Sequence, residues 1–432
     1  MKNIFKLSRF QNPRGFKQPQ GSGNFRRTNS AGTGLAAVLF LTVFMLCSGC
    51  GDLNSEADGI AIGSAVDLAK IGKDPDYPLG GNYYLSSNIV FPDSPAWQSI
   101  GSDLPFTGTF DGRDYTIRNL KLDEGTGPYP DRLIGLFGHT DSASIENLNI
   151  ELAANPISLT VDKQYVGAVA GYGERTSFRN VVVRPAGSAG SMSIRKSTGD
   201  IYAGGIAGKL DRGSVIKNSY SLTALNVESG GGVYAGGLAG ENEGRITNSY
   251  TAGSVSAESA ASLTAYAGGI AGNNTGAVEN VYATGDISVT NSGIAYAGGI
   301  AGASTSSAIE HCAALGTAIS AVGGSGQYLG RITGTSITLN ADNFALDTMT
   351  LASSNNPASP GTPTAITGIS STDENGADKF LTDLEIPETY SDPSPGGLGW
   401  DFVDVWDWDA DANRPKLRGE SSPPPSIPIP IP

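Results

Sequence analysis

The sequence predicts an all-β protein, a parallel β-helix that forms a three-sided solenoid from repeats of about 30–32 residues between terminal caps. The first observation is the motif YAGGIAG, which occurs in strict or looser copies at 165–171, 202–208, 234–240, 266–272, 296–302 and 328–334. Secondly, the tyrosines that open these copies are 37, 32, 32, 30 and 32 residues apart, a near-constant period typical of solenoids and propellers. Thirdly, most other positions hold Ala, Gly, Ser or Thr, which suit coils stacked about 4.8 Å apart because larger side chains would clash with their own copies.

Each repeat continues with two further short strands. A polar turn follows the motif and leads to a second strand, as at Arg245–Tyr250, and a Gly turn leads to a third, as at Ser254–Ser256. Alternation places Ile246, Asn248 and Tyr250 on one side of the second strand, and we expect this side to be the interior because Ile246 is apolar. The three segments would form the three sides of one coil.

One asparagine keeps its place in almost every repeat, eight to ten residues after the last Gly of the motif. These residues are Asn147, Asn180, Asn218, Asn248, Asn280 and Asn343. A buried amide is costly unless it is hydrogen-bonded, and stacked copies can satisfy one another. We therefore expect a structural asparagine ladder in the interior, interrupted where His311 takes the Asn place. Asn242, in contrast, is expected in a tolerant polar turn.

Four variable segments separate the third strand of one repeat from the next motif: 221–233, 257–264, 289–295 and 321–327. We expect them to be loops along one edge of the solenoid. Repeat proteins often bind their partners through such an edge.

These repeats resemble the GLUG motif of bacterial surface proteins, which also include streptococcal IgA-specific metallopeptidases. The match is close at 202–220, 234–250 and 266–282, and the segment 106–120 looks like the coil that usually precedes such repeats. Together the resemblance covers most of residues 60–418. It implies a parallel β-helix on a cell surface and does not by itself imply an activity.

The N-terminus has the features of a bacterial lipoprotein leader. Residues 1–34 carry seven Lys or Arg and no acid, and an apolar run of twelve residues follows at 35–46. The small residues Ser48 and Gly49 precede Cys50, as in a lipobox, so we expect removal of residues 1–49, lipidation (such as palmitate) at Cys50, and attachment to a membrane. Ordinary secretory cleavage near Gly49, with Cys50 free, is the alternative. The expected location is the bacterial envelope, at the outer membrane or cell surface.

Composition divides the chain into seven segments. The expected segments are a signal peptide (1–49), a lipidated tether (50–59), an N-terminal cap with the first strands (60–105), the β-helix (106–350), a loop (351–376), a Trp-rich C-terminal cap (377–420) and a Pro-rich tail (421–432). The chain has 28 basic and 42 acidic residues, a net charge of −14, which argues against a nucleic-acid partner. Of its cysteines only Cys312 lies beyond the leader region, so we expect no intramolecular disulfide.

The sequence offers few candidates for chemistry. Asp409, Asp411 and Asn413 fall at positions 1, 3 and 5 of a calcium loop, but Arg414 replaces the Gly that this loop requires. We therefore expect no metal, with these three residues as the weak candidates, and no cofactor.

Among the acids, Asp111 and Asp114 beside Arg113 are the candidate pair for a glycan-cleaving enzyme on this fold, but Asp111-Gly112 is more typical of a turn. The sequence has no HExxH motif of the zinc metallopeptidases.

We therefore expect a non-catalytic, lipid-anchored surface protein that acts in adhesion or ligand binding. Its expected partner is a glycan or protein of a host or of a neighbouring cell. Two alternatives stay open: an envelope polysaccharide lyase or glycoside hydrolase on a β-helix, and a purely structural spacer. A groove holding close carboxylates would favour the enzyme, whereas a flat polar edge would favour the binder.

Overall fold

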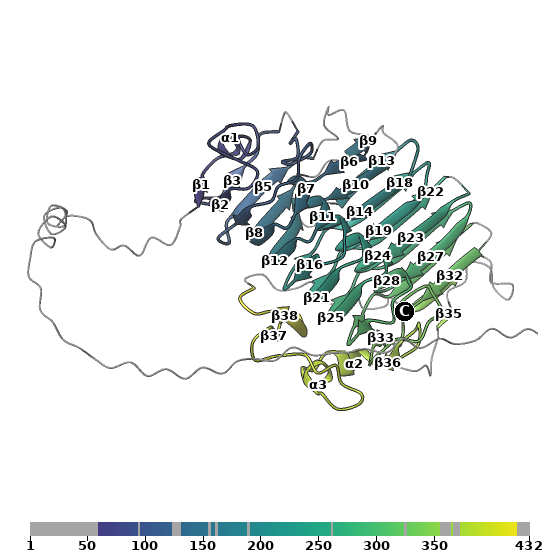
Figure 1. Cartoon of the computed structure of the whole chain (residues 1–432). Coiled ribbons are helices and arrows are strands. Elements are labelled where there is room, and N and C mark those ends of the chain that lie inside the picture. Colours follow the sequence, from purple (N-terminus) through teal and green to yellow (C-terminus); the bar gives the residue numbers. More distant parts are fainter. Residues whose placement is uncertain are drawn as a thin grey trace, which may run out of the picture. The chain divides into compact units, whose positions relative to one another are not determined.

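The computed structural model describes residues 59–420, except 94–95, 123–130, 154–156, 160–162, 188–190, 261, 324–325, 355–363 and 366–371. In this part the chain winds into a parallel β-solenoid (Figure 1). Its strands stack into four long sheets, here named S1 to S4 in the order in which one coil visits them. The prediction of an all-β parallel β-helix is confirmed.

Sheet S1 holds the tyrosine half of each motif and sheet S2 the second half. In S1 the strands are β6 (Asp131–Ile134), β10 (Lys163–Gly167), β14 (Ile201–Gly204), β19 (Val233–Gly236), β23 (Thr264–Gly268), β27 (Ile294–Gly298) and β32 (Gly326–Gly330). In S2 they are β7 (Phe137–Asp141), β11 (Ala170–Glu174), β15 (Ala207–Leu210), β20 (Ala239–Asn242), β24 (Ala271–Asn274) and β28 (Ala301–Ser304). The motif is therefore one bend between two strands.

Sheet S3 contains the asparagine-bearing strands and the N-terminal strands. Its main path is β1 (Ile60–Ile62), β2 (Asn82–Leu85), β4 (Thr109–Asp111), β8 (Ser144–Leu152), β12 (Ser177–Pro185), β16 (Val215–Lys217), β21 (Arg245–Thr251), β25 (Ala277–Ala283), β30 (Ala313–Ala314), β33 (Phe344–Leu346) and β36 (Ala377–Lys379). Off this path lie β3 (Ile89–Val90), β5 (Thr116–Leu120), β17 (Tyr220–Ser221) and β29 (Ile309–Glu310).

Sheet S4 occupies much of the chain that the sequence analysis assigned to edge loops. Its strands are β9 (Ile157–Leu159), β13 (Ser191–Lys196), β18 (Ala224–Ser229), β22 (Val255–Ser259), β26 (Ile287–Asn291), β31 (Ala318–Val322), β34 (Thr350–Ser353) and β35 (Thr364–Ala365). The expectation of a loop-lined edge is wrong here, because alternating residues such as Leu225 and Val227 are buried and extend the sheet.

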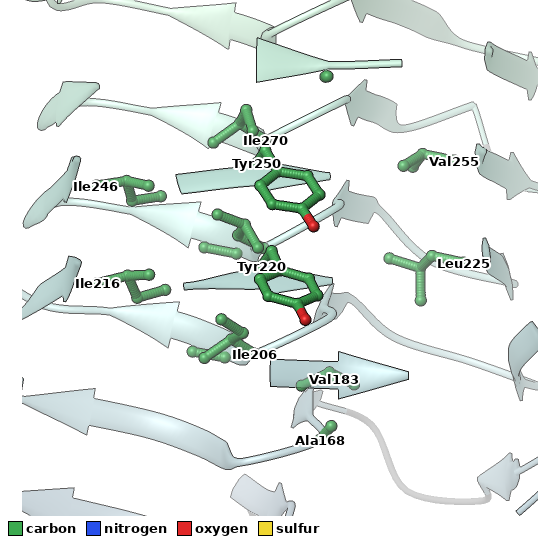
Figure 2. Close-up of a cluster of buried hydrophobic side chains, with 14 of the residues drawn as sticks. Ala168, Val183, Ile206, Ile216, Tyr220, Leu225, Ile246, Tyr250, Val255 and Ile270 are labelled. Carbon is green, nitrogen blue, oxygen red and sulfur yellow. The ribbon is translucent and has the colours of Figure 1, made fainter. Parts of the chain in front are cut away.

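The interior is filled by stacked copies of apolar residues, one from each coil. Ile216 and Ile246 lie directly above one another on S3, and Leu225 and Val255 do the same on S4 (Figure 2). The second Gly of the four strict copies, as at Gly237, makes a close contact in this packing. A Cβ at Gly237 would lie 2.1 Å from the Gly269 carbonyl oxygen in the next coil, so any larger residue would push the coils apart.

The repeated asparagines turn the backbone rather than fill the interior. Five of them adopt left-handed φ angles: Asn147 (51°), Asn180 (52°), Asn218 (51°), Asn248 (50°) and Asn280 (52°); His311, at the Asn place, does the same (54°). All five are half-buried or exposed. Asn tolerates this region better than most residues, which explains its recurrence. The interior placement expected from the sequence is therefore corrected.

Partial ladders do join these asparagines. Asn180 donates to Asn147 (2.8 Å), and Asn280 donates to Asn248 (3.3 Å). Asn343 belongs to another position, because Phe344 pairs with Ala313 and so aligns Asn343 with Cys312. It is fully buried and accepts the Cys312 amide (3.0 Å).

The left-handed residue also reverses the faces of the strand that follows it. Thr251 faces the interior, since a Cβ on Gly237 would contact its methyl carbon at 2.8 Å. Tyr250 therefore points outward, and its hydroxyl donates to Glu420 (2.5 Å). The assignment of Tyr250 to the interior is wrong because strict alternation fails at Asn248.

A separate amide row lies inside the solenoid. Asn242 donates to Asn274 (2.7 Å), which donates to Ser304 (3.1 Å), and all three side chains are fully buried. Asn242 also accepts the amide of Gly244 (3.1 Å). The expected tolerance of Asn242 is therefore not supported by its surroundings.

The ends of the described chain carry the remaining elements. Helix α1 (Ala65–Leu68) begins after Ser64, whose hydroxyl accepts the Asp67 amide (3.2 Å). Near the C-terminus lie α2 (Leu381–Leu384), α3 (Glu388–Ser391) and an antiparallel hairpin of β37 (Trp406–Asp409) and β38 (Arg414–Leu417). The hairpin lies beside β21 and β25 (Figure 1).

Candidate functional site

The most extended surface feature is a row of six tyrosines on sheet S1, here called the open tyrosine row. It consists of Tyr165, Tyr202, Tyr234, Tyr266, Tyr296 and Tyr328. Val233 and Ala235 on either side of Tyr234 are fully buried, so alternation directs the tyrosine outward. The motif thus places one phenol on the same face of every coil.

Neighbouring rings of this row are stacked. Their centroids are 4.8, 4.2, 4.8, 5.1 and 4.8 Å apart along the row, with interplanar angles between 7° and 30°. Exposure rises from 9% at Tyr202 to 47% at Tyr328. Because ring faces cover one another, the row offers mainly ring edges and hydroxyl groups to a partner.

A second, charged row follows the first on sheet S2. Strand register aligns His139, Tyr172, Lys209, Glu241 and Asn273 in consecutive coils. The Tyr172 ring lies 5.9 Å from that of Tyr165, so the two rows adjoin. Together they form a polar and aromatic face along the solenoid.

Lys209, the cation of the charged row, forms ion pairs with carboxylates of the same chain. Lys209 Nζ lies 2.9 Å from Glu241 and 2.7 Å from Glu243. Burial alone would lower the pKa of Lys209, but the ion pairs with Glu243 and Glu241 outweigh it and raise that pKa. Lys209 therefore stays charged, and its two glutamate partners balance its positive charge on this face.

The phenols of Tyr202, Tyr234 and Tyr266 remain protonated at physiological pH. Burial raises the pKa of Tyr202, and the neighbouring Tyr234 and Glu241 raise it further. Burial likewise raises the pKa of Tyr234 and of Tyr266. Each hydroxyl therefore keeps its proton and can donate a hydrogen bond.

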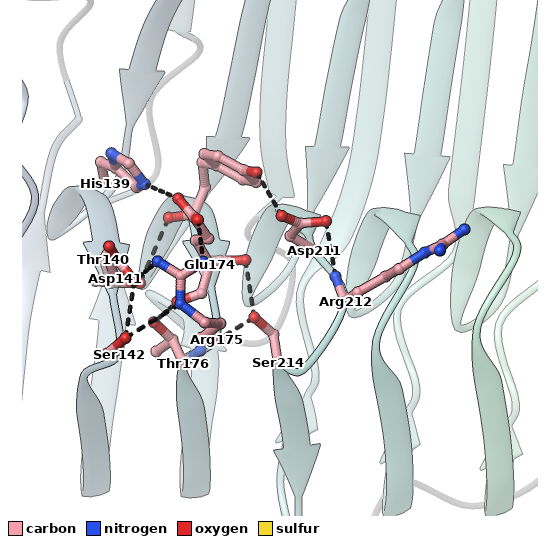
Figure 3. A network of polar contacts seen from close by, with 12 residues as sticks. His139, Thr140, Asp141, Ser142, Glu174, Arg175, Thr176, Asp211, Arg212 and Ser214 are labelled. Atoms are coloured by element: carbon pink, nitrogen blue, oxygen red, sulfur yellow. Dashed lines mark hydrogen bonds and ion pairs between the residues drawn. The ribbon is translucent and has the colours of Figure 1, made fainter. Parts of the chain in front are cut away.

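An ionic network ends the charged row at its N-terminal side (Figure 3). His139 Nε2 lies 3.4 Å from a Glu174 carboxylate oxygen, and Arg175 bridges Glu174 and Asp141, the latter at 2.6 Å. Burial lowers the pKa of His139, although Glu174 opposes this effect. The neutral imidazole is a possible proton acceptor, while Arg175 is held by carboxylates on two coils.

The hydroxyl of Tyr172 is also engaged in this network. It donates to Asp211 (3.0 Å), and burial, with Asp211 adding, raises the pKa of Tyr172. Among the described residues no group of three or more His, Cys, Asp or Glu side chains could hold a metal ion. The network therefore offers hydrogen bonds and a single His–carboxylate pair.

The residues singled out from the sequence lie apart from this face. Cys50 falls outside the described residues. Asp409 accepts the amides of Asp411 (3.1 Å) and Ala412 (2.8 Å), and Asn413 has φ 53°, so these residues form the turn between β37 and β38. The carboxylate of Asp409 already serves the hairpin turn.

The carboxylate pair considered for glycan cleavage serves a turn as well. Asp111 accepts the Arg113 amide (2.8 Å) and the Asn147 side-chain amide (3.0 Å). Arg113 and Asp114 both have positive φ angles, as a tight turn requires. The carboxylate of Asp111 thus supports the start of the asparagine row.

Sequence reasoning recorded the open tyrosine row as a repeat marker and missed it as a surface. The spacing of these tyrosines, about one coil, was the signal in the sequence that could have revealed the row. The charged row had no comparable signal, because His139, Tyr172, Lys209 and Glu241 share no residue type and only strand register brings them together. No helix in the part of the chain described here is long and apolar enough to cross a membrane.

Sequence comparisons support the repeat assignment. Residues 264–290 match the model of the GLUG motif, which confirms the resemblance on which the repeat prediction was based. Halomucin from Haloquadratum walsbyi is 29% identical over 186 residues, which is 41% of this chain and 2% of halomucin. The chain thus spans a very small part of that relative.

Two solved structures match this chain, and the first of them has a similar fold. A Bacteroides ovatus protein, whose name assigns it provisionally to the immunoglobulin A1 proteases, matches with a TM-score of 0.52 and 19% identity, over 84% of this chain and 93% of that one. A second, named IgA1 protease, has a TM-score of 0.47 and 18% identity, over 77% of this chain and 24% of that one. At these identities the likeness shows the fold alone.

The expectation that the chain is no enzyme is corrected by the first of these structures. The same β-helix occurs in a protein named for a peptidase, so the fold gives no ground for excluding catalysis. What the sequence and structure establish is a β-helix protein with GLUG-type repeats.

Proposed function

We propose that this protein is a cell-surface β-solenoid, anchored through lipid on Cys50, that binds a partner of a host or of a neighbouring cell. The binding surface is the face formed by the open tyrosine row and the charged row. The observation that carries this proposal is the stack of six outward phenols, with ring centroids 4.2 to 5.1 Å apart.

The arrangement suits an extended partner that lies along the solenoid axis. Each phenol can donate one hydrogen bond, worth only about 0.5–1.5 kcal/mol by itself. Repetition over several coils adds many such contacts in one direction. The rigid stack keeps the hydroxyl groups in place, so little side-chain entropy is lost on binding.

This proposal moves the interaction surface from the predicted loops to a sheet face. The segments 257–264 and 289–295 lie largely in S4 and its short connections. The tyrosines of S1, in contrast, form one continuous outward row over six coils, and its exposure is greatest at Tyr328. The sequence analysis associated a flat polar edge with a binder, whereas the surface proposed here is a polar and aromatic sheet face.

Attachment at the surface rests on the N-terminal residues and on the GLUG motif. The basic segment 1–34, the apolar run 35–46 and the small residues before Cys50 support lipidation. Intact-mass analysis of protein extracted from membranes is expected to show an acylated N-terminal Cys50. A Cys50→Ser variant is expected in the soluble fraction, and recovery of both forms with the membranes would contradict the anchor.

The binding proposal is tested with the full chain on panels of glycans and surface proteins. Removing two hydroxyls in the variant Tyr234→Phe/Tyr266→Phe is expected to weaken binding without loss of the circular-dichroism signal. Tyr115→Phe is the matched control, because Tyr115 is 36% exposed and lies outside the row. Equal binding by both variants would place the site elsewhere, and no binding to any panel member would favour a spacer.

The same incubations are assayed for cleaved glycosidic and peptide bonds. Turnover that depends on His139 or Glu174 would move the function from binding to catalysis at the ionic network. Turnover unaffected by either residue would direct attention to another part of the chain.

A further inference from the structure

The solenoid has a second outward tyrosine row, and this one is covered. Tyr220, Tyr250 and Tyr282 lie on neighbouring strands of S3, with ring centroids 4.6 and 4.7 Å apart and planes within 8° of parallel. Their exposures are 3%, 0% and 0%. The stacking repeats that of the open tyrosine row, but here another part of the chain excludes water.

The cover is the C-terminal segment 400–420. The Tyr282 ring lies 6.2 Å from the ring of Trp400 and 6.0 Å from that of Trp406. The Tyr282 hydroxyl donates to the Pro415 carbonyl oxygen (2.8 Å), and the Tyr250 hydroxyl donates to Glu420 (2.5 Å). The row therefore holds a polypeptide segment in two ways. Its rings pack against aromatic side chains, and its hydroxyl groups donate hydrogen bonds to a carbonyl and a carboxylate oxygen.

This attachment uses side chains rather than sheet extension. Strands β37 and β38 pair only with each other within the described residues. The contacts with the solenoid come from the tyrosines and from Trp400, whose indole nitrogen donates to the His311 carbonyl oxygen (2.9 Å). In this molecule an outward tyrosine stack thus contributes most of the named contacts to a segment that adds no strand to the sheet.

We infer that the open tyrosine row binds an aromatic-rich polypeptide segment in the way that the covered row holds residues 400–420. This inference rests on the proposed function and specifies its partner. The two rows share residue type, outward direction and ring spacing. Backbone carbonyls are the acceptors that any extended peptide supplies at regular intervals.

Ring stacking favours a peptide over a sugar. Carbohydrates bind aromatic residues largely through ring faces, and in this row the faces cover one another. Hydroxyl groups and ring edges remain, and these match carbonyl oxygens and aromatic side chains.

Charge narrows the partner further. At the covered row Arg184 donates to the Tyr220 hydroxyl (2.6 Å), which favours the nearby carboxylate of Glu420. At the open tyrosine row the charges near the phenol of Tyr234 are negative instead. Burial raises the pKa of Tyr234, and the carboxylates of Asp200 and Glu241 raise it further. A segment with neutral rather than acidic side chains fits the open row.

The test uses a labelled synthetic peptide of residues 400–420 with Asp401→Asn, Asp404→Asn and Asp407→Asn. These three acids are exposed in the segment, and their replacement leaves equal numbers of acidic and basic residues. Fluorescence anisotropy measures its binding to the full chain, with neutral oligosaccharides as a parallel set of probes.

Binding of the peptide is expected, and Tyr234→Phe/Tyr266→Phe is expected to weaken it about tenfold, since two lost hydrogen bonds contribute roughly that factor. Tyr115→Phe is the control. If the Tyr234→Phe/Tyr266→Phe variant binds the peptide as tightly as the unchanged protein, the peptide replaces residues 400–420 on the covered row. That result would overturn the inference. Oligosaccharide binding that needs the tyrosine pair, with no peptide binding, would overturn the inference and leave the proposed function standing. If no probe and no panel member binds, both the inference and the proposed function are contradicted.

Discussion

The left-handed asparagines allow a direct test of what these residues do. We consider two triple variants of Asn218, Asn248 and Asn280, one with glycine and one with alanine at all three positions. Both variants lose the side-chain amides, including the hydrogen bond between Asn280 and Asn248. They differ only in the presence of a Cβ at φ angles of 50° to 52°.

The expected difference follows from the backbone. A residue with a Cβ pays about 1–2 kcal/mol in the left-handed region, whereas glycine adopts it freely. Three positions give a difference of about 3–6 kcal/mol, with the glycine variant more stable. If the amide ladder alone mattered, the two variants would be equally damaged.

Urea unfolding of the full chain, followed by far-ultraviolet circular dichroism, measures this difference. Asn226 is the control position, because it is exposed in β18 and its φ is not positive. There alanine should be the more stable replacement by about 0.5–1 kcal/mol, since glycine weakens a strand. An alanine triple variant as stable as the glycine one would refute the backbone explanation.

Three further changes test the interior and the ionic network. Asn242→Ala should cost about 1–3 kcal/mol in the same urea assay, because it removes the partner of the buried Asn274; an unchanged midpoint would contradict the interior amide row. Gly237→Ala should give little folded protein on size-exclusion chromatography, since its Cβ would meet Thr251 and backbone of the next coil; normal yield would contradict the packing. Burial lowers the pKa of His139, so the unfolded chain binds more protons and stability should decrease as pH falls below about 6.5; His139→Gln should reduce this pH dependence, and an identical dependence would exclude His139.

Periodicity was enough to predict the fold and the repeat period. A motif that returns about every 32 residues can be satisfied by stacking each copy on the next, and Tyr202, Tyr234 and Tyr266 do pair in register. Small residues at the remaining positions were consistent with coils one strand spacing apart. These properties depend on local composition and period, so they can be read along the chain.

The faces of the strands could not be obtained in this way. Alternation assumes that every residue is extended, and one left-handed residue at Asn248 moves Tyr250 from the interior to the outside. An asparagine in the sequence is compatible with either a buried ladder or such a turn. Only the backbone conformation separates the two.

The sequence by itself therefore determined the solenoid, its period and the recurrence of one tyrosine on every coil. The tertiary structure decided which residues share a surface: Lys209 meets Glu241 across 32 residues, and Tyr282 meets Trp406 across more than a hundred. The physical reason is that such contacts depend on strand register between coils and on the path of the C-terminal segment. Neither property leaves a periodic signal in the chain, because Lys209 and Glu241 differ in type although they share a register position, and the Trp-rich segment that covers Tyr282 occurs once.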